Sequence, residues 1–122
     1  MSKISKQDKQ RIVDGINQLK IHIKEKNFKE AHSTINQIKP IVTRTSFAQY
    51  ELVLYQSFLA KDEGDSKSCI EFASQALRLK PGDANSQKLC ILSYEKLNDN
   101  DNLQNSISTY LAPHEKDEQQ DA

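Results

Sequence analysis

Apolar residues recur at steps of three and four along most of the chain, which is the spacing of one helix face. The first two stretches with this spacing cover about residues 8–25 and 28–39, and a short polar segment joins them. Pro40 disfavours helical geometry at the residue before it, so we expect the second helix to end at Lys39. Residues 41–45 are then predicted to be a connector.

Residues 47–62 carry the most continuously apolar helical pattern of the chain. Ser46, followed three residues later by Gln49, is typical of a capping box, in which two side chains satisfy free amides at a helix start. We therefore predict a third helix that begins near Phe47 and ends near Asp62. Because apolar residues lie on nearly all of its faces, neighbouring helices must cover most of them. The third helix is thus predicted to be central.

Two further helices follow from turn residues and caps. Gly64 supplies a turn, and Asp65 is suited to cap a fourth helix that ends near Leu79. Asp83 is suited to cap a fifth helix that ends near Leu97. Each of these helices carries its own apolar stripe.

The last helix and both ends of the chain are more polar. Asp99 or Asp101 is placed to cap a sixth helix that ends near Leu111. After it, residues 113–122 are acidic and polar, have nothing to bury and are predicted to be disordered. Residues 1–7 are predicted to be a disordered amino terminus.

The apolar frame repeats with a period of about 34 residues, a length typical of stacked helical repeats. The surface residues do not repeat with it. Apolar residues are paired by this shift as Tyr55 with Leu89, Phe58 with Leu92, Cys69 with Leu103, Ala73 with Ile107 and Ala76 with Tyr110. Such an array presents a large surface to another protein, so the pattern indicates a binding function.

The composition agrees with one soluble domain. The chain has 122 residues, of which 36% are hydrophobic and 28% charged, and we expect the folded domain to cover residues 8–112. No apolar run approaches the length of about eighteen residues that a membrane span needs, and the first residues lack the apolar stretch of a signal peptide. We expect a cytoplasmic protein without membrane contact.

The sequence offers little for catalysis. The three histidines are scattered, and no Gly-rich phosphate loop is present. Cys69 and Cys90 stand inside apolar helical patterns without the spacing of a metal or redox site, so we interpret them as buried, reduced residues. We expect no enzymatic activity and no cofactor. The net charge of zero and the lack of a known motif argue against nucleic-acid binding.

Charge is unevenly distributed along the chain. Residues 1–30 carry eight basic and four acidic residues, a net charge of +4, whereas residues 95–122 carry two basic and seven acidic residues, a net charge of −5. Solvation of a helix and a tail explains this difference. The alternative is a head-to-tail contact between copies, or a partner that recognises one end.

Short motifs recur in three successive units of the chain. They are Gly64-Asp65 in a turn, Ala76 late in the following helix, Leu77-x-Leu79-x-Pro81 at its close, Tyr94-x-x-Leu97 in the third unit and Phe28-x-x-Ala31 in the first. With these residues, residues 50–83 resemble one unit of the tetratricopeptide repeat (TPR) family, and the resemblance extends over three units, about residues 12–111. The family's usual Trp is absent. The resemblance implies an all-α, right-handed array of helical hairpins, a TPR-like α-solenoid of about six helices. A helical-hairpin array without true repeats is the alternative.

The TPR resemblance implies a concave groove lined by the first helix of every pair. The positions that would line it are Lys20, Lys24, Glu51, Leu54, Tyr55, Phe58, Lys88, Leu92 and Lys96. An apolar floor ringed mainly by lysines suits a peptide with apolar anchors and acidic flanks, so we expect an adaptor or a client chaperone. The alternative for Tyr55 and Phe58 is that they close the core against a neighbouring helix.

The sixth helix suggests a second function. Leu103, Ile107 and Leu111 share one face of it, and no further helix follows to cover them. Repeat arrays normally end in a polar cap, so this face is the expected contact of a homodimer. The alternative to peptide binding is therefore a structural module that self-associates through its last helix.

Overall fold

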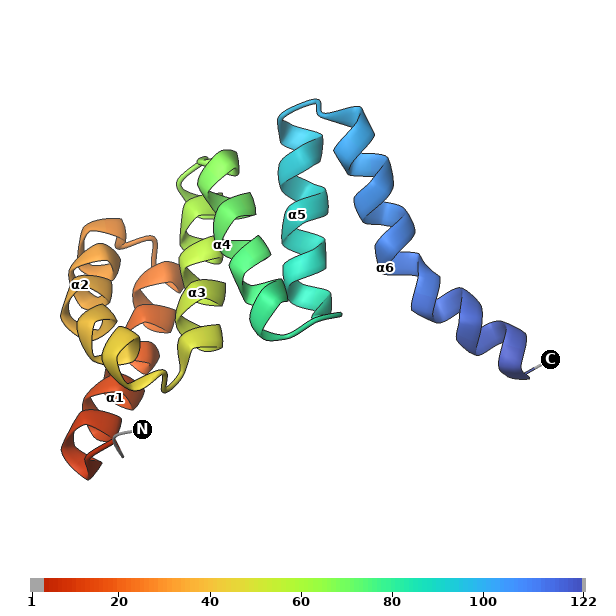
Figure 1. Ribbon diagram of the computed structural model, residues 1–122. Helices are drawn as coiled ribbons and strands as arrows, with labels where there is room; N and C mark the ends of the chain where they lie inside the picture. Colours follow the sequence, from red (N-terminus) through yellow and green to blue (C-terminus); the bar gives the residue numbers. More distant parts are fainter. Residues whose placement is uncertain (1–3, 122) are drawn as a thin grey trace.

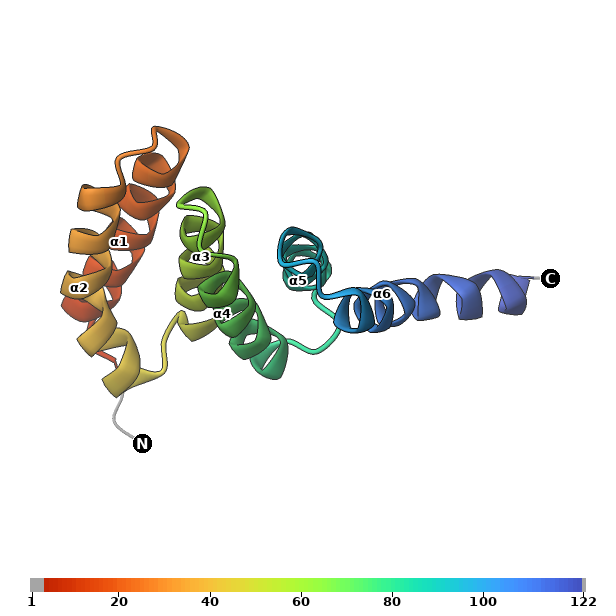
Figure 2. The same ribbon diagram turned by 90° about the horizontal axis from the view of Figure 1, so that it is seen from above.

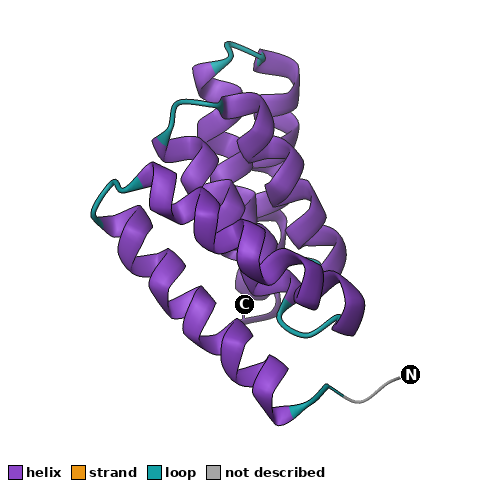
Figure 3. Cartoon of the chain, turned by 90° about the vertical axis from the view of Figure 1, so that its left-hand side faces the viewer, coloured by secondary structure: helices purple, strands orange, loops and turns teal. Residues whose placement is uncertain are grey.

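Six α-helices make up the described part of the protein, and they follow one another as three hairpins (Figure 1). The computed structural model describes residues 4–121, with side chains for residues 4–112. No strand occurs among the described residues (Figure 3), so the predicted all-α fold class is confirmed. The helices are α1 (Lys6–Lys24), α2 (Phe28–Thr45), α3 (Gln49–Asp62), α4 (Ser66–Leu79), α5 (Ala84–Lys96) and α6 (Asn100–Asp121).

The same backbone turn closes each hairpin. Lys26, Gly64 and Asn98 have positive φ angles of 62°, 83° and 57°, and the N–H of the next residue donates to a carbonyl five residues earlier. These bonds are Asn27 N to His22 O (2.8 Å), Asp65 N to Ala60 O (2.8 Å) and Asp99 N to Tyr94 O (3.0 Å). A residue in the left-handed conformation followed by this hydrogen bond defines the Schellman motif, which satisfies free carbonyls at a helix end. The turn predicted at Gly64 is confirmed.

The turn residues also fix the register between hairpins. Positions 26, 64 and 98 are 38 and 34 residues apart, so the stretch from the first turn to the second is four residues longer than the stretch from the second turn to the third. The excess lies in α2, which has 18 residues against 14 in α4. With a shift of 38 residues, buried positions of α2 match buried positions of α4, as Ala31 with Cys69, Ile35 with Ala73 and Ile38 with Ala76.

The predicted end of the second helix at Lys39 is wrong, because α2 continues through Pro40 to Thr45. A proline inside a helix costs roughly 3 kcal/mol through a lost hydrogen bond and a steric clash. Continuing the helix buries Val42 and places Ile41 against the core, and burial of such side chains contributes about 1.5–3 kcal/mol each. Burial therefore offsets the proline, and the predicted connector is the last part of α2.

The predicted capping box at Ser46 and Gln49 is also wrong. Ser46 has a φ angle of 61° and ends α2, with its N–H donating to the carbonyl of Val42 (2.8 Å). α3 begins at Gln49 after Ala48, whose side chain makes no cap hydrogen bond. Because α2 reaches so far, Ser46 ends one helix instead of starting the next.

The other predicted caps are confirmed. The carboxylate of Asp65 accepts from the N–H of Ser68 (3.1 Å), and that of Asp83 accepts from the N–H of Ser86 (3.1 Å). Asp99 caps α6 in the same way, through the N–H of Asn102 (3.3 Å). Each bond satisfies an amide that has no partner within its helix.

Both ends of the folded chain extend further than predicted. α1 begins at Lys6 instead of residue 8, because the Ser5 hydroxyl caps it by accepting from the N–H of Asp8 (3.0 Å). α6 continues to Asp121 instead of ending near Leu111, through a segment rich in the good helix formers Glu, Lys and Gln. Residues 1–3 and 122 of the predicted disordered ends lie outside the described residues, and disorder at the ends stays a prediction.

Two clusters of buried side chains form the core. The first joins α1 and α2 and receives Leu52 and Leu59 from α3, and the second joins α3, α4 and α5 around Cys69 and Leu89. α3 therefore contacts α1, α2, α4 and α5, which confirms its predicted central position. Among the described residues, α6 contributes none to either cluster.

The hairpins lie side by side in chain order, and the array is open (Figures 1 and 2). α3 contacts both helices of the preceding hairpin, and α5 contacts both helices of the hairpin before it. Within the described part of the chain, the backbones of α2 and α4 stay apart, as do those of α4 and α6 (Figure 2). The second helices of neighbouring hairpins are thus separated by space that side chains only partly fill.

Candidate functional site

α3 exposes one stripe of side chains, and this stripe carries the predicted groove residues. Glu51 is exposed and Tyr55, Phe58 and Asp62 are partly exposed, at the spacing of a single helix face. Leu54 is only 6% exposed and belongs to the second core cluster, so its predicted place on the groove floor is wrong. A step of one residue from Tyr55 turns the side chain toward α4 and α5 instead of solvent.

We call the exposed surface of α1, α3 and α5 the first-helix face, because these helices begin the three hairpins. It is made of the predicted groove residues that the structure leaves fully or partly exposed. They are Lys20, Lys24, Glu51, Tyr55, Phe58, Lys88, Leu92 and Lys96.

Tyr55 and Phe58 form the aromatic centre of the first-helix face. Their ring centroids are 6.1 Å apart with a tilt of 37° between the ring planes. Tyr55 also packs against the first core cluster, and Phe58 against the second. Both predicted interpretations therefore hold in part, since each ring covers core side chains on one side and meets solvent on the other.

Lysines from α1 and α5 lie beside aromatic rings. The Nζ of Lys20 is 5.4 Å from the ring centroid of Tyr55, and the Nζ of Lys88 is 6.0 Å from that of Tyr110 in α6. An ammonium group at such a distance over a ring gains roughly 0.5–1 kcal/mol at an exposed site. The contact of Lys20 brings the α1 and α3 parts of the first-helix face together.

A shallow hollow lies on the first-helix face between α1 and α3. Its volume is about 240 Å³, and its lining includes Val13 and Lys20 from α1, Phe47 and Ala48 from the connection, and Glu51 from α3. Val13 is 40% exposed and offers an apolar contact at the edge. The sequence did not indicate Phe47 as part of this surface, because it was assigned to the start of a helix.

The charges of the first-helix face are mainly positive. Lys24 and Lys96 are exposed. Asp62, at the edge of the α3 stripe, forms an ion pair with Lys26 (3.1 Å), which compensates its charge. Glu51 remains as the acidic residue among the eight that define this face.

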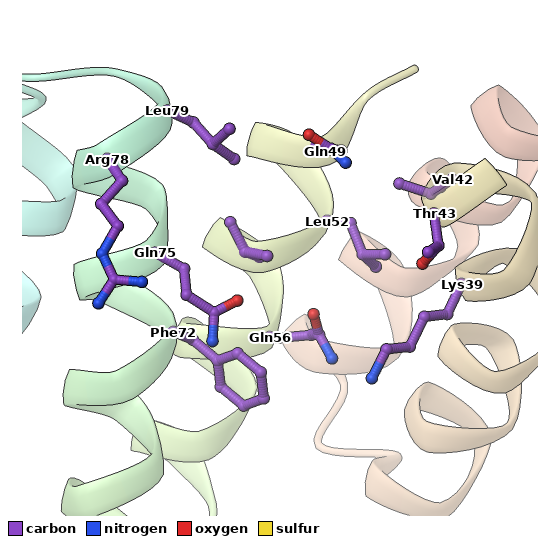
Figure 4. A pocket seen from close by; sticks show the side chains of 11 residues that line it. Lys39, Val42, Thr43, Gln49, Leu52, Gln56, Phe72, Gln75, Arg78 and Leu79 are labelled. Carbon is purple, nitrogen blue, oxygen red and sulfur yellow. The ribbon is translucent and has the colours of Figure 1, made fainter. Parts of the chain in front are cut away.

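A second hollow lies between α2 and α4, with α3 as its floor (Figure 4), and sequence analysis missed it. Its volume is about 380 Å³. The lining residues are Lys39, Val42, Thr43, Gln49, Leu52, Val53, Gln56, Phe72, Gln75, Arg78 and Leu79. The separation of α2 and α4 follows from how the hairpins pack, which the sequence pattern did not reveal. The polar Gln56 inside an apolar helical pattern was the one available signal.

The predicted dimer face on α6 is more covered than expected. Leu103 and Ile107 are partly buried in the hairpin that α6 forms with α5, whereas Leu111 is 44% exposed. The shift of 34 residues relates Leu103 and Ile107 to Cys69 and Ala73, which are fully buried in α4. The inner side of α6 is therefore less covered than the same positions of α4.

A buried polar junction holds α3 to the connection between α4 and α5. Asp83 is 8% exposed, and its carboxylate accepts from the Ser86 hydroxyl (2.6 Å), the Ser86 N–H (3.1 Å) and the Tyr50 hydroxyl. Burial alone would raise the pKa of Asp83, but these hydrogen bonds outweigh it and lower the pKa. Burial, and then the hydrogen bond to Asp83, raises the pKa of Tyr50.

We predict that Asp83→Asn lowers the free energy of unfolding by about 1 kcal/mol at neutral pH, because it removes the charge and keeps a good cap residue. A carboxyl with a lowered pKa in the folded state stabilises above its unfolded pKa of about 4 and loses that effect as the pH falls through the folded pKa. Urea unfolding of both proteins at neutral and acidic pH tests this. The difference between them should shrink in acid, and a difference that stays constant contradicts the assignment.

Metal-binding and membrane-spanning features are not found in the part of the chain that the structure describes. No three His, Cys, Asp or Glu residues there come together as metal ligands, and no described helix has the length and apolar character to cross a membrane. Cys69 and Cys90 are buried free thiols, and burial raises the pKa of Cys90 to about 11, which keeps it protonated at neutral pH.

No protein-family model, curated protein or solved structure matches the chain.

Proposed function

We propose that this chain is a non-enzymatic, cytoplasmic protein-interaction module of the TPR type, an adaptor or client chaperone that holds a partner segment against its first-helix face. Two features support a repeat array. Lys26, Gly64 and Asn98 close three successive hairpins with the same turn. In addition, buried residues of α2 recur in α4 once the longer α2 is taken into account.

The observation that carries the proposal is the pair of rings on α3. Four helices surround α3, and its remaining stripe presents Tyr55 and Phe58, partly exposed and 6.1 Å apart. Aromatic side chains that are held by a core and open to solvent on one side bury a large area on binding and lose little conformational entropy. They are also enriched among the residues that dominate binding energies.

The charge of the first-helix face indicates the chemistry of the partner. Lys20 lies over the ring of Tyr55. Lys24, Lys88 and Lys96 are exposed on α1 and α5, and Leu92 on α5 is 43% exposed. Such a surface favours a segment with apolar anchors and acidic flanks, and the lysines would speed its association at low salt. Increasing salt should therefore lower the association rate constant and change the dissociation rate constant much less.

We predict that Leu92→Glu releases partners that the wild-type chain retains from an extract of its native cells. Leu92 is already exposed, so the change does not disturb the core, but it places a carboxylate where an acidic partner segment would lie. Quantitative mass spectrometry of the retained proteins measures the loss, which should be about tenfold or more for a central contact.

The matched control is Ile21→Glu. Ile21 is 53% exposed on α1, and neither the first-helix face nor the hollow between α2 and α4 includes it. Proteins that Ile21→Glu retains and Leu92→Glu loses are partners of the first-helix face. Equal loss or equal retention in the two variants contradicts the proposal.

A second candidate function is self-association through α6. The observation that favours it is the incomplete cover of Leu103 and Ile107 together with the exposed Leu111. Apolar area left in water costs about 25 cal/mol per Å², so a second copy that covers this side would be stabilising. A closed two-fold dimer is the simplest form of such a contact.

Sedimentation at low and high salt separates this candidate from a charge-driven contact between the ends of two chains. We predict that an apolar dimer persists in high salt and dissociates in Ile107→Glu, whereas a head-to-tail contact between oppositely charged ends weakens as salt rises. A wild-type monomer at micromolar concentration under both conditions removes self-association and leaves the peptide-binding function.

A further inference from the structure

The hollow between α2 and α4 is a second surface suited to binding. We call it the second-helix cleft and define it by Lys39 on α2, Leu52 and Gln56 on α3, and Phe72 and Arg78 on α4 (Figure 4). Its volume of about 380 Å³ lies in the range of ligand pockets. It adjoins a smaller hollow of about 200 Å³, whose lining shares Lys39, Gln56 and Phe72 with it. Together the two hollows follow the length of α2 and α4.

Gln56 is the polar group at the floor of this cleft. The residue is 8% exposed, no hydrogen bond is found for its side-chain amide among the described residues, and the amide atoms stay open to solvent in the cleft. The amide makes no bond within the protein, so it is available to a ligand that displaces the solvent in the cleft. Its amide extends into the cleft between α2 and α4 (Figure 4). Its N–H donors and its carbonyl acceptor can pair with the C=O and N–H of an extended peptide backbone.

The charges around the larger hollow are positive. Lys39 extends toward Gln56 from α2, Arg78 lies at the rim on α4, and no acidic residue belongs to the lining (Figure 4). The carboxylates of the smaller hollow have partners within the protein. The Glu63 carboxylate contacts the Nε2 of His32 (2.8 Å), and the Asp65 carboxylate caps α4.

We propose that the second-helix cleft binds an extended peptide segment in which an acidic residue alternates with an apolar one. The Gln56 amide pairs with the peptide backbone, Lys39 and Arg78 attract the carboxylate, and Phe72 and Leu79 cover the apolar side chain. Because side chains of an extended chain alternate between two sides, the acidic and apolar residues of such a segment meet the rim and the floor in turn.

This site is separate from the first-helix face. Leu52 and Gln56 follow Glu51 and Tyr55 by one residue each, which places them about 100° further round α3, and no residue of the first-helix face lines the cleft. A single chain could therefore hold two segments at once, one on each side of α3. The two surfaces can be tested independently.

The test is a titration of ¹⁵N-labelled protein with an acetylated and amidated pentapeptide of alternating Leu and Glu, followed by NMR. We expect saturable shifts of the Gln56 side-chain amide and of backbone amides near Phe72 and Gln75. Peptides with Gln or Lys in place of Glu are the comparison, and the Lys peptide should produce no saturable shift, because it brings a second positive charge to Lys39.

Lys39→Glu should weaken binding of the Leu and Glu peptide about tenfold or more, since it replaces attraction by repulsion. The matched control is Lys29→Glu, which makes the same charge change at an exposed position of α2 outside the cleft and should bind as the wild type does. Equal effects of the two variants would show that net charge, and not the cleft, controls binding.

Gln56→Leu gives a readout that a purely structural role would not produce. It should abolish saturable binding while the thermal midpoint of unfolding stays equal or rises, because the substitution breaks no hydrogen bond within the protein. Unchanged affinity in this variant, or no saturable shift at Gln56 in the wild type, overturns the proposal. Shifts confined to Tyr55 and Leu92 would also overturn it, and would support the first-helix face as the binding site.

Discussion

The enclosure of α3 by four other helices is the constraint on which the rest of the structure depends. Leu52 and Leu59 enter the core shared with α1 and α2, while Leu54 enters the core shared with α4 and α5. Because both cores meet on one helix, neither hairpin beside it can move without uncovering apolar side chains. The solvent-facing stripe of α3 is therefore held in place from both sides, and with it the rings of Tyr55 and Phe58.

The sequence predicted helix boundaries correctly where a boundary depends only on a nearby turn or cap residue. Asp65, Asp83 and Gly64 have roles that depend on a few neighbouring residues, and the structure confirms them. The prediction was wrong at Pro40 and Ser46, because burial of Val42 outweighs the local preference of a proline and moves the end of α2 and the start of α3. Tertiary packing of this kind is not visible in a local pattern.

The candidate surfaces were predictable to different degrees. The TPR resemblance suggested that Tyr55 and Phe58 line an exposed groove, and helical spacing placed them on one face, but neither could show that Leu54 lies in the core. The second-helix cleft could not be predicted at all, because it depends on the separation of α2 and α4. Gln56 illustrates the reason. The sequence shows a polar residue in an apolar helix, but only the structure shows that this residue lines an open cleft.

The central claim, that a partner segment lies on the first-helix face, is tested most directly by photo-cross-linking from single positions. p-Benzoylphenylalanine would replace Glu51 or Leu92 on that face, or Lys67 on the exposed side of α4, in an extract of native cells. We predict that positions 51 and 92 trap the same partner segment, rich in apolar and acidic residues, and that position 67 traps none. Cross-links of equal yield from position 67, or unrelated proteins at positions 51 and 92, would contradict the claim.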